Sequence, residues 1–377
     1  MSNVLLVGTG YVADLYMRSL KTFPEMRVVA AFDRHAARLA QFCGYWGIKA
    51  AESLDDLLSQ SHDGDIILNL TNPSEHYAVS LACLETGRHV YSEKPLATEM
   101  SNAYALHAMA TSKNVLLASA PCSVLGEAAQ TMWRAVRDEV AGKPLLVYAE
   151  LDDDFVSQAP FRKWISESGA PWPYADEFRV GCTLEHAGYY LTWLIAMFGP
   201  VKTVVAASAR VVQDNEIGEQ PAPDFSSATL FFDAGVVARL TCSIVAPHNH
   251  SLQIFGTRGV LTTSESWNNA AKVSFRRRFS LRRRLINSPV TQRIRLPGPT
   301  HPKVGRLGAV AMNFALGPVE MFAAIREGRP CRINADFALH LNEVTLAIQN
   351  SGQNCVATTM QTRCNPMEPM TWAQARS

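Results

Sequence analysis

The sequence predicts an α/β protein of two domains, a doubly wound parallel sheet followed by an α+β domain with a large, mostly antiparallel open sheet. Apolar, strand-like runs alternate with helical stretches over residues 4–118, as they do in parallel sheets. Between residues 201 and 263 such runs follow one another with only short turns, which is typical of antiparallel strands. Because 377 residues exceed one ordinary hydrophobic core, we place the domain boundary at residue 121, giving domains 1–121 and 122–377.

The first domain opens with a glycine turn suited to a dinucleotide. The apolar strand at residues 4–7 runs directly into Gly8 and Gly10, which begin a G-x-G-x-x-A pattern. Gly8 permits the tight turn, and Gly10 leaves room for a pyrophosphate to approach the backbone. The helix that begins near Tyr11 and Val12 directs its free N–H groups at the anion. These four residues are therefore predicted to contact a cofactor.

A second strand completes the dinucleotide-binding fingerprint of a Rossmann domain. Residues 28–32 form a continuous apolar run that ends at Asp33, about twenty residues after the second glycine. A carboxylate at this place bonds the adenosine ribose hydroxyls and repels a 2′-phosphate, which favours NAD. Arg34 follows directly and could instead pair with that phosphate, so NADP stays an alternative cofactor.

The remaining elements follow in order along the chain. Ser53 is expected to cap a short helix, and Gly87 to end a longer one. In the first domain, further helices are predicted at 35–42, 74–85 and 99–111, and strands at 65–70, 89–92 and 115–118. In the second domain, helices are predicted at 125–140 and 184–198, strands at 145–151, 201–207, 227–232, 236–244, 252–255 and 260–263, and a loop-rich segment at 155–180.

The composition indicates a folded protein without a general affinity for polyanions. Apolar residues make up 47% and charged residues 18%, and the formal net charge is +1, so no overall attraction to nucleic acid or to an anionic membrane is expected. No apolar run reaches the roughly twenty residues that span a bilayer. Residues 1–3 leave no room for a signal peptide before the first strand. Eight scattered cysteines indicate reduced thiols, so we expect a cytoplasmic location.

Three clusters of polar residues are candidates for metal or polyanion binding. His248 and His250 lack a third nearby ligand, and Asp152–Asp154 indicates a solvated strand end, so no metal site is expected. The arginine triplets 276–278 and 282–284 form the one strong local charge cluster. A solvated hairpin and a site for a polyanion, such as a diphosphate, an acidic polysaccharide or a membrane surface, stay open as explanations.

Four segments carry a resemblance to a known family. Thr71–His76 is similar to a T-P-P-x-x-H loop, with Asn72 in place of a proline, and Glu85–Val90 with Glu93–Ala97 is similar to an E-A-G-K-H-V…E-K-P-L-A block. Ala335–Leu339 resembles a closing helix, expected at about 335–350 and packed back toward the first domain. Together they resemble the glucose-fructose oxidoreductase and inositol dehydrogenase family (Gfo/Idh/MocA) over most of the chain.

The resemblance implies an NAD(P)-dependent dehydrogenase or reductase that acts on a ring hydroxyl or ketone of a sugar, cyclitol or sugar nucleotide. It implies cofactor contacts at Thr71, Asn72 and His76, Glu93 near the nicotinamide ribose and Lys94 at the reacting oxygen. It also implies a homodimer or homotetramer formed through the second domain's sheet. Hydride leaves a carbon only as its hydroxyl proton leaves, so Lys94 is expected to move that proton, with a pKa lowered by desolvation and the cationic nicotinamide.

The helix that should face the nicotinamide departs from the family pattern. His186 stands where the family has an Asp, and Tyr190 stands where it has a His. Their i, i+4 spacing predicts one helix face, so we expect Tyr190 or His186 to work with Lys94 in catalysis. Alternatively, both are substrate or packing contacts and Lys94 acts alone, or hydride chemistry is lost. Glu185, which is spaced in the same way from Tyr189, is a further candidate for the acid and for substrate contact.

The loop-rich segment supplies candidate substrate contacts. Trp164 and Trp172 offer aromatic faces to the C–H side of a sugar ring, and Arg162 and Lys163 could meet a carboxylate or phosphate. Packing of a lid is the alternative role for this segment. Two other functions also stay open: an NAD-assisted lyase or glycosidase that oxidises its sugar only transiently, and a nucleotide-binding protein without catalysis.

Overall fold

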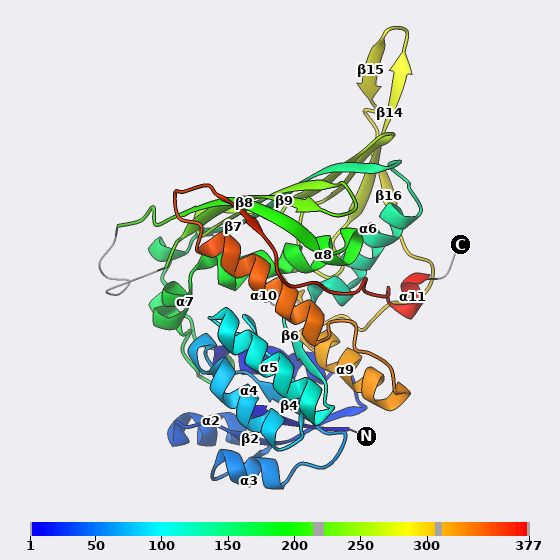
Figure 1. The fold of residues 1–377 in the computed structure, drawn as a ribbon. Helices are drawn as coiled ribbons and strands as arrows, with labels where there is room; N and C mark the ends of the chain where they lie inside the picture. The colour runs from blue at the N-terminus through cyan, green and yellow to red at the C-terminus, as the bar shows by residue number, and fades with distance from the viewer. Residues whose placement is uncertain (1, 214–221, 306–310, 375–377) are drawn as a thin grey trace.

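A computed structural model describes residues 2–213, 222–305 and 311–374, which form two sheets with helices packed between and around them (Figure 1). The first sheet has six parallel strands in the order β3-β2-β1-β4-β5-β6. Their bounds are β1 Ser2–Val7, β2 Met26–Phe32, β3 Lys49–Ala50, β4 Ile66–Asn69, β5 His89–Ser92 and β6 Leu117–Ser119. The order reverses at β1, as in a doubly wound fold, so the predicted Rossmann sheet is confirmed.

Helices cover the first sheet at the points that the sequence marks. They are α1 Tyr11–Leu20, α2 Ala36–Trp46, α3 Leu54–Ser59, α4 His76–Glu85 and α5 Met100–Lys113. The Ser53 side chain accepts a hydrogen bond of 3.0 Å from the Asp56 amide and so caps α3. Gly87, with φ of +75°, takes the left-handed conformation after α4.

The second sheet has eleven strands within the described ranges, and its pairs are antiparallel except β7 with β10. The path is β15-β14-β13-β12-β7-β10-β9-β8-β17, with β11 on β7 and β16 on β14. The bounds are β7 Pro144–Phe155, β8 Val201–Ala209, β9 Phe225–Phe232, β10 Val237–Ser243, β11 Val245–Asn249, β12 Leu252–Gly256, β13 Gly259–Thr263, β14 Val273–Leu281, β15 Arg284–Asn287, β16 Gln292–Ile294 and β17 Ala357–Thr359. The predicted, mostly antiparallel sheet is confirmed, although β11 and β14–β17 were not predicted.

Helices line one face of the second sheet and separate it from the first domain (Figure 1). The helices of this part are α6 Glu127–Arg137, α7 Tyr174–Val180, α8 Gly188–Phe198, α9 Leu316–Glu327, α10 Ala335–Gln349 and α11 Thr371–Gln374. A π-helical turn, Thr183–Ala187, leads into α8. Helix α8 is buried on nearly all sides, with Trp193 and Leu194 at 1% and 0% exposure, as its almost wholly apolar sequence requires.

Helix α10 joins the two domains. Its Asn342 side chain accepts a hydrogen bond of 3.2 Å from the Ala97 amide, and Asp336 lies 2.6 Å from His107 of α5. Leu339 belongs to the same buried apolar cluster as Leu106 of α5. The closing helix therefore packs against the first domain, although 245 positions separate Asn342 from Ala97.

The arginine triplets lie on the β14–β15 hairpin, which projects from the body of the molecule (Figure 1). Arg282 occupies the turn with φ of +56°. Within the described ranges, no helix combines the length and the apolar character needed to cross a membrane.

The buried His340 of α10 predicts a loss of stability in acid. Its Nε2 accepts a hydrogen bond from the Val201 amide, which requires an unprotonated nitrogen, and burial lowers its pKa from 6.5 to about 4. As the pH falls from about 6.5 to 4, His340 therefore takes up a proton in the unfolded chain but stays unprotonated in the native state. We expect this one group to remove about 2 kcal/mol of unfolding free energy between pH 7.5 and pH 5.

Urea unfolding at the two pH values measures this effect. The variant His340→Gln keeps an acceptor for the Val201 amide but cannot titrate, so it should lose less stability in acid than the unmodified chain. An equal loss in both proteins would show that His340 is not the cause.

Candidate active site

A cavity of about 280 Å³ lies between the two domains. Its first-domain wall is formed by the glycine turn and by the loops after β4 and β5, and its second-domain wall by α7, the π-helical turn and nearby strands. Lining residues include Gly10, Tyr11, Val12, Thr71, Asn72, His76, Glu93 and Lys94 from the first domain and Asp153, Trp164, Trp172, Glu177, Glu185, His186, Tyr189 and Trp267 from the second. The carboxyl ends of parallel strands at a switch point are where such folds bind ligands.

The glycine turn has the shape that a pyrophosphate requires. Gly8 has φ of +94°, and a Cβ there would lie 2.6 Å from the Leu70 carbonyl oxygen, so only glycine fits. A Cβ at Gly10 would meet no atom within 4 Å, so this backbone borders open space. The residues present therefore fit a dinucleotide, with the first N–H groups of α1 facing the space that its phosphates would take.

Asp33 is buried and already fully hydrogen-bonded. Its carboxylate accepts from the Thr9 amide at 2.8 Å, the His35 amide at 2.8 Å and the guanidinium of Arg38 at 2.8 and 3.0 Å. Burial acts to raise the pKa of Asp33, but these hydrogen bonds outweigh it and lower that pKa. Arg34 is exposed and lies 3.3 Å from Glu75. Asp33 thus stands beside the glycine turn as predicted, but a ribose would have to share it with Arg38.

Two first-domain residues brace the loops of the cavity. His76 is buried, with Nδ1 2.7 Å from the Pro95 carbonyl oxygen and Nε2 2.9 Å from that of Thr71, so it joins both cofactor loops. Glu93 accepts a hydrogen bond of 2.6 Å from the Tyr16 hydroxyl. Both side chains therefore hold their positions through contacts within the protein.

Lys94 forms the centre of a charged cluster that spans the domains. Its ammonium forms an ion pair with Glu185, and Glu185 is hydrogen-bonded to Glu177 of α7. Burial acts to lower the pKa of Lys94, but the two carboxyl groups outweigh it and raise that pKa well above its usual value. The expected lowered pKa is therefore wrong for this structure, because the sequence did not show that Glu185 would meet the amine.

Glu177 and Glu185 differ in their protonation states. Burial raises the pKa of Glu177 well above its usual value, and the neighbouring Glu185 carboxylate adds to this rise. Burial would also raise the pKa of Glu185, but Lys94 and the hydrogen bond from Glu177 lower it. The cluster therefore holds an ammonium, a carboxylate and a protonated carboxyl group in a row.

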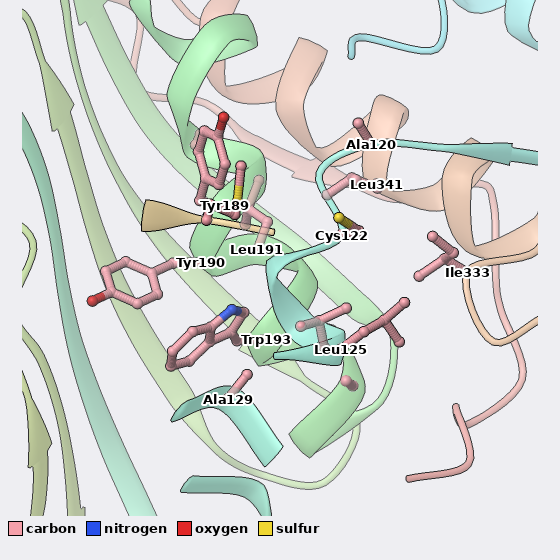
Figure 2. Packing of buried hydrophobic residues seen from close by; sticks show 14 of the residues in the cluster. Ala120, Cys122, Leu125, Ala129, Tyr189, Tyr190, Leu191, Trp193, Ile333 and Leu341 are labelled. Carbon is pink, nitrogen blue, oxygen red and sulfur yellow. The ribbon is translucent and has the colours of Figure 1, made fainter. Parts of the chain in front are cut away.

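The structure corrects the prediction for Tyr190. The residues of this helical segment that line the cavity are Cys182, Glu185, His186 and Tyr189. Successive steps of three and four positions, from Cys182 to Glu185 and from Glu185 to Tyr189, put these three residues on one helix face, so the face that lines the cavity is centred on Glu185 and Tyr189. That face lies one residue before the predicted one, so His186 stands at its margin and Tyr190 beyond it. The Tyr190 hydroxyl donates to the His250 carbonyl oxygen, and its ring packs 5.3 Å from that of Trp193. Figure 2 shows Tyr189 and Tyr190 pointing in different directions.

His186 lies in the cavity as a neutral imidazole. Burial and, to a smaller extent, the Lys94 cation lower its pKa to about 3. Its Nε2 is 3.5 Å from Asp153, and its Nδ1 is buried without a hydrogen-bond partner in the described residues.

The loop-rich segment separates into cavity wall and outer surface. Trp164 and Trp172 line the cavity with ring centroids 4.9 Å apart. Arg162 and Lys163 are exposed and do not line it, which corrects their prediction as substrate contacts. The Arg162 guanidinium instead stacks 4.9 Å from the Tyr174 ring centroid and donates to its hydroxyl.

The same segment is fastened to the first domain. Ser168 donates through its amide and its hydroxyl to Asp14 of α1, at 3.0 and 2.8 Å. Glu167 pairs with Arg18 at 2.7 Å. Farther along, Asp176 of α7 accepts a hydrogen bond from Asn72. The segment is therefore tied to the first domain beside the cavity through polar contacts.

Sequence reasoning missed Glu177 and Asp153. Glu177 lies in α7, inside the segment that was predicted to be loop-rich, although Pro173 followed by acidic residues is a signal for a helix start. Asp153 was assigned to solvent because its strand was expected to end before it, whereas β7 continues to Phe155.

Comparison with known proteins identifies the family. Residues 2–120 match the model of the oxidoreductase family with NAD-binding Rossmann fold, and residues 129–262 match the GFO/IDH/MocA C-terminal domain. The trans-1,2-dihydrobenzene-1,2-diol dehydrogenase of Mus musculus is 24% identical over 266 residues, which cover 70% of this chain and 74% of that protein. The myo-inositol 2-dehydrogenase of Thermotoga maritima is 21% identical over 263 residues, which cover 67% and 72%.

A solved structure supports the same fold. The WlbA dehydrogenase from Bordetella pertussis, in complex with NADH and UDP-GlcNAcA, superposes with a TM-score of 0.72 at 17% identity and covers 95% of this chain and 97% of that chain. Both family models match in order along the chain, one on each of its sheets. The chain therefore belongs to the GFO/IDH/MocA family of NAD-binding oxidoreductases.

Proposed function

We propose that the protein transfers a hydride between a nicotinamide cofactor and a ring hydroxyl or ketone of a carbohydrate-like molecule. The observation that carries this proposal is the position of Lys94, whose ammonium lies in the cavity between Glu93 and the Glu185–Glu177 pair. The substrate class rests on two relatives that are named for a cyclic diol and a cyclitol, and on a solved structure in complex with a sugar nucleotide.

The cofactor would lie along the first-domain wall. The glycine turn and the start of α1 would hold its pyrophosphate, and the loop at Thr71 and Asn72 would continue toward Glu93. When bound, the nicotinamide supplies the hydride acceptor or donor. Glu93, fixed by Tyr16, is placed to orient the ribose beside it.

Lys94 then moves the proton that accompanies the hydride. In oxidation, the Lys94 ammonium passes a proton to the Glu185 carboxylate as its nitrogen takes the proton of the substrate hydroxyl, so the net result is one proton transferred to Glu185 and the charge is conserved. In reduction, the ammonium gives a proton to the forming alkoxide and recovers one from Glu177 through Glu185. Because the raised pKa keeps Lys94 protonated, the reduction direction starts from the form that the structure favours.

The second-domain wall would hold the substrate. Trp164 and Trp172 offer apolar faces of the kind that stack on the C–H side of a sugar ring. His186 and Tyr189 can hydrogen-bond ring hydroxyls, since His186 stays neutral and burial raises the pKa of Tyr189.

Steady-state assays with NAD and NADP test the proposal. Cyclic diols, inositols, free sugars and UDP-sugars would be supplied in turn, with NADH or NADPH formation followed by absorbance. At least one class should give continuous net reduction of the cofactor. Binding of NAD without net reduction by any of these classes would overturn the proposal and favour transient sugar oxidation or a protein without catalysis.

Asp33 and Arg38 predict a switch of cofactor preference. Replacing Asp33 by serine removes the carboxylate that repels a 2′-phosphate and frees the guanidinium of Arg38 to meet it. We expect the ratio of kcat/KM for NADP over NAD to rise by at least about tenfold, or roughly 1.4 kcal/mol. In the double variant Asp33→Ser/Arg38→Ala the gain should disappear, and a gain that persisted would remove Arg38 from the explanation.

We also propose that copies associate through the second sheet, on the face away from α6, α8 and α10. Figure 1 shows no helix over that face. Tyr148 and Phe255 form a ring pair there at 5.0 Å, with the Arg239 guanidinium over Tyr148 at 4.3 Å. Light scattering after size exclusion should give a dimer or tetramer, and Tyr148→Glu should yield monomers. A monomer in the unmodified chain would contradict this assignment.

A further inference from the structure

A second polar cluster adjoins the cavity beyond His186. It consists of Asp153 on β7, His248 on β11 and His250 just after β11. One ligand atom from each of the three residues lies within 4.8 Å of the others. Strands β7 and β11 pair with an irregular register between Ala246 and Asn249, and such a bulge redirects the side chains that it carries.

Glu265, in the loop after β13, orients both imidazoles. Its Oε2 lies 3.1 Å from Nε2 of His248, and its Oε1 lies 2.9 Å from Nδ1 of His250. The backbone amides of Ser266 and Trp267 donate to the same carboxylate at 2.9 Å and hold it in place. A neutral histidine that donates from one nitrogen leaves the other as a free lone pair. Glu265 therefore leaves Nδ1 of His248 and Nε2 of His250 as acceptors.

Among the described residues, neither freed nitrogen accepts a hydrogen bond from another protein group. His250 is 1% exposed, and its Nε2 is buried without a hydrogen-bond partner in the described residues. Nδ1 of His248 lies 3.9 Å from Oδ1 of Asp153, which is longer than a direct hydrogen bond. Two ligand atoms that each bind one metal ion at about 2.0–2.2 Å lie farther apart than two atoms joined by a hydrogen bond. The separation between His248 and Asp153 is of this longer kind.

We propose that Asp153, His248 and His250 bind one divalent transition-metal ion. Two imidazoles and a carboxylate suit zinc or a neighbouring first-row ion, whereas magnesium prefers oxygen ligands. The carboxylate behind each histidine is the arrangement that commonly fixes the tautomer of metal-binding imidazoles. Three protein ligands leave a coordination position open, and Asp153 lines the cavity, so this position faces the substrate.

The open position defines a narrower substrate class, and this step rests on the proposed function. The ion would accept an oxygen on a carbon next to the one that Lys94 serves. Vicinal diols, hydroxy ketones and hydroxy acids have such a second oxygen. His186, 3.5 Å from Asp153, stands between the two positions.

Titration of the full-length, chelator-treated chain with zinc chloride tests the site without any nucleotide. Calorimetry should show one ion per chain, and cobalt chloride should give visible absorption bands at the same stoichiometry. Magnesium chloride should give no binding heat. All proteins would carry Cys355→Ser, because Cys355 is the exposed thiol of the described residues and could bind zinc by itself.

Variants locate the ion. Asp153→Asn and His248→Ala should each weaken zinc binding at least about 100-fold, and Glu265→Gln should weaken it by roughly 10–100-fold because it loosens the imidazoles. His107→Ala is the matched control, since His107 also pairs with a carboxylate and is similarly exposed but lies on α5. Because the His248 side chain is 39% exposed, its removal leaves the core intact.

Two results would overturn the proposal. One is the absence of stoichiometric zinc or cobalt binding to the chain that carries Cys355→Ser alone. The other is binding that survives both Asp153→Asn and His248→Ala, with circular dichroism and NAD affinity unchanged. A failed metal titration leaves net NADH formation untouched, and failed NADH formation leaves the titration untouched, so the two proposals are tested separately.

Discussion

Replacing Lys94 by methionine is expected to lower kcat by roughly 10²–10⁴-fold, because the group that carries the substrate proton is removed while the shape of the side chain is kept. Affinity for NADH should change little, since the glycine turn and the loop at Thr71 stay intact. Steady-state assays measure kcat, and fluorescence titration with NADH measures the cofactor affinity separately.

The same variant leaves Glu185 buried without its cation, which is destabilising by up to about 3–5 kcal/mol unless the carboxylate takes up a proton. The double variant Lys94→Met/Glu185→Gln should recover stability but not activity, which distinguishes proton transfer from folding. Lys163→Met is the control, since Lys163 is exposed outside the cavity. Near-normal kcat in Lys94→Met would remove Lys94 from the mechanism.

Replacing Gly8 by alanine is expected to destabilise the first domain and to abolish measurable cofactor binding. The φ of +94° is strained for any residue with a side chain, at about 1–3 kcal/mol, and the added Cβ would meet the Leu70 carbonyl oxygen at 2.6 Å. Thermal unfolding and NADH titration report the two losses.

Gly10→Ala provides the matched comparison. Its Cβ would meet nothing within 4 Å, and φ of −76° suits alanine, so the melting temperature should stay unchanged. NADH affinity should nevertheless fall at least about tenfold, because the methyl group occupies the space of the pyrophosphate. Unchanged affinity in Gly10→Ala would show that the nucleotide does not approach this turn.

The first domain could be predicted because its signals are local. Buried parallel strands such as β4 are apolar at every position, and Ser53, Gly8 and Gly87 mark the turns that they occupy. The strands of the second domain were predicted where apolar residues alternate. Strands β14 and β15 were not predicted, since arginines interrupt their apolar residues and their outer parts are mostly exposed.

The site could be predicted only in part, because it is assembled across the two domains. The E-K-P motif predicted Lys94 in the cavity, but the partner that sets its charge, Glu185, comes from a helix 91 positions away. A one-residue difference in the helix face placed Tyr190 in the core. Asp153 and His248 become neighbours only through the pairing of β7 with β11, which no spacing in the sequence reveals.

Contacts at Ser168 and Asp176 hold the loop-rich segment against the first domain, and we expect them to slow the exchange of ligands in the cavity. We expect a nucleotide bound along the first-domain wall to exchange faster when the contacts at Asp14, Arg18 and Asn72 separate. Ser168 and Asp14 are buried, whereas Arg18 and Glu167 are partly exposed, so dissolved salt screens the Arg18–Glu167 pair most. We therefore expect ionic strength to change how long the protein retains its coenzyme, through the Arg18–Glu167 pair, independently of how fast it performs chemistry.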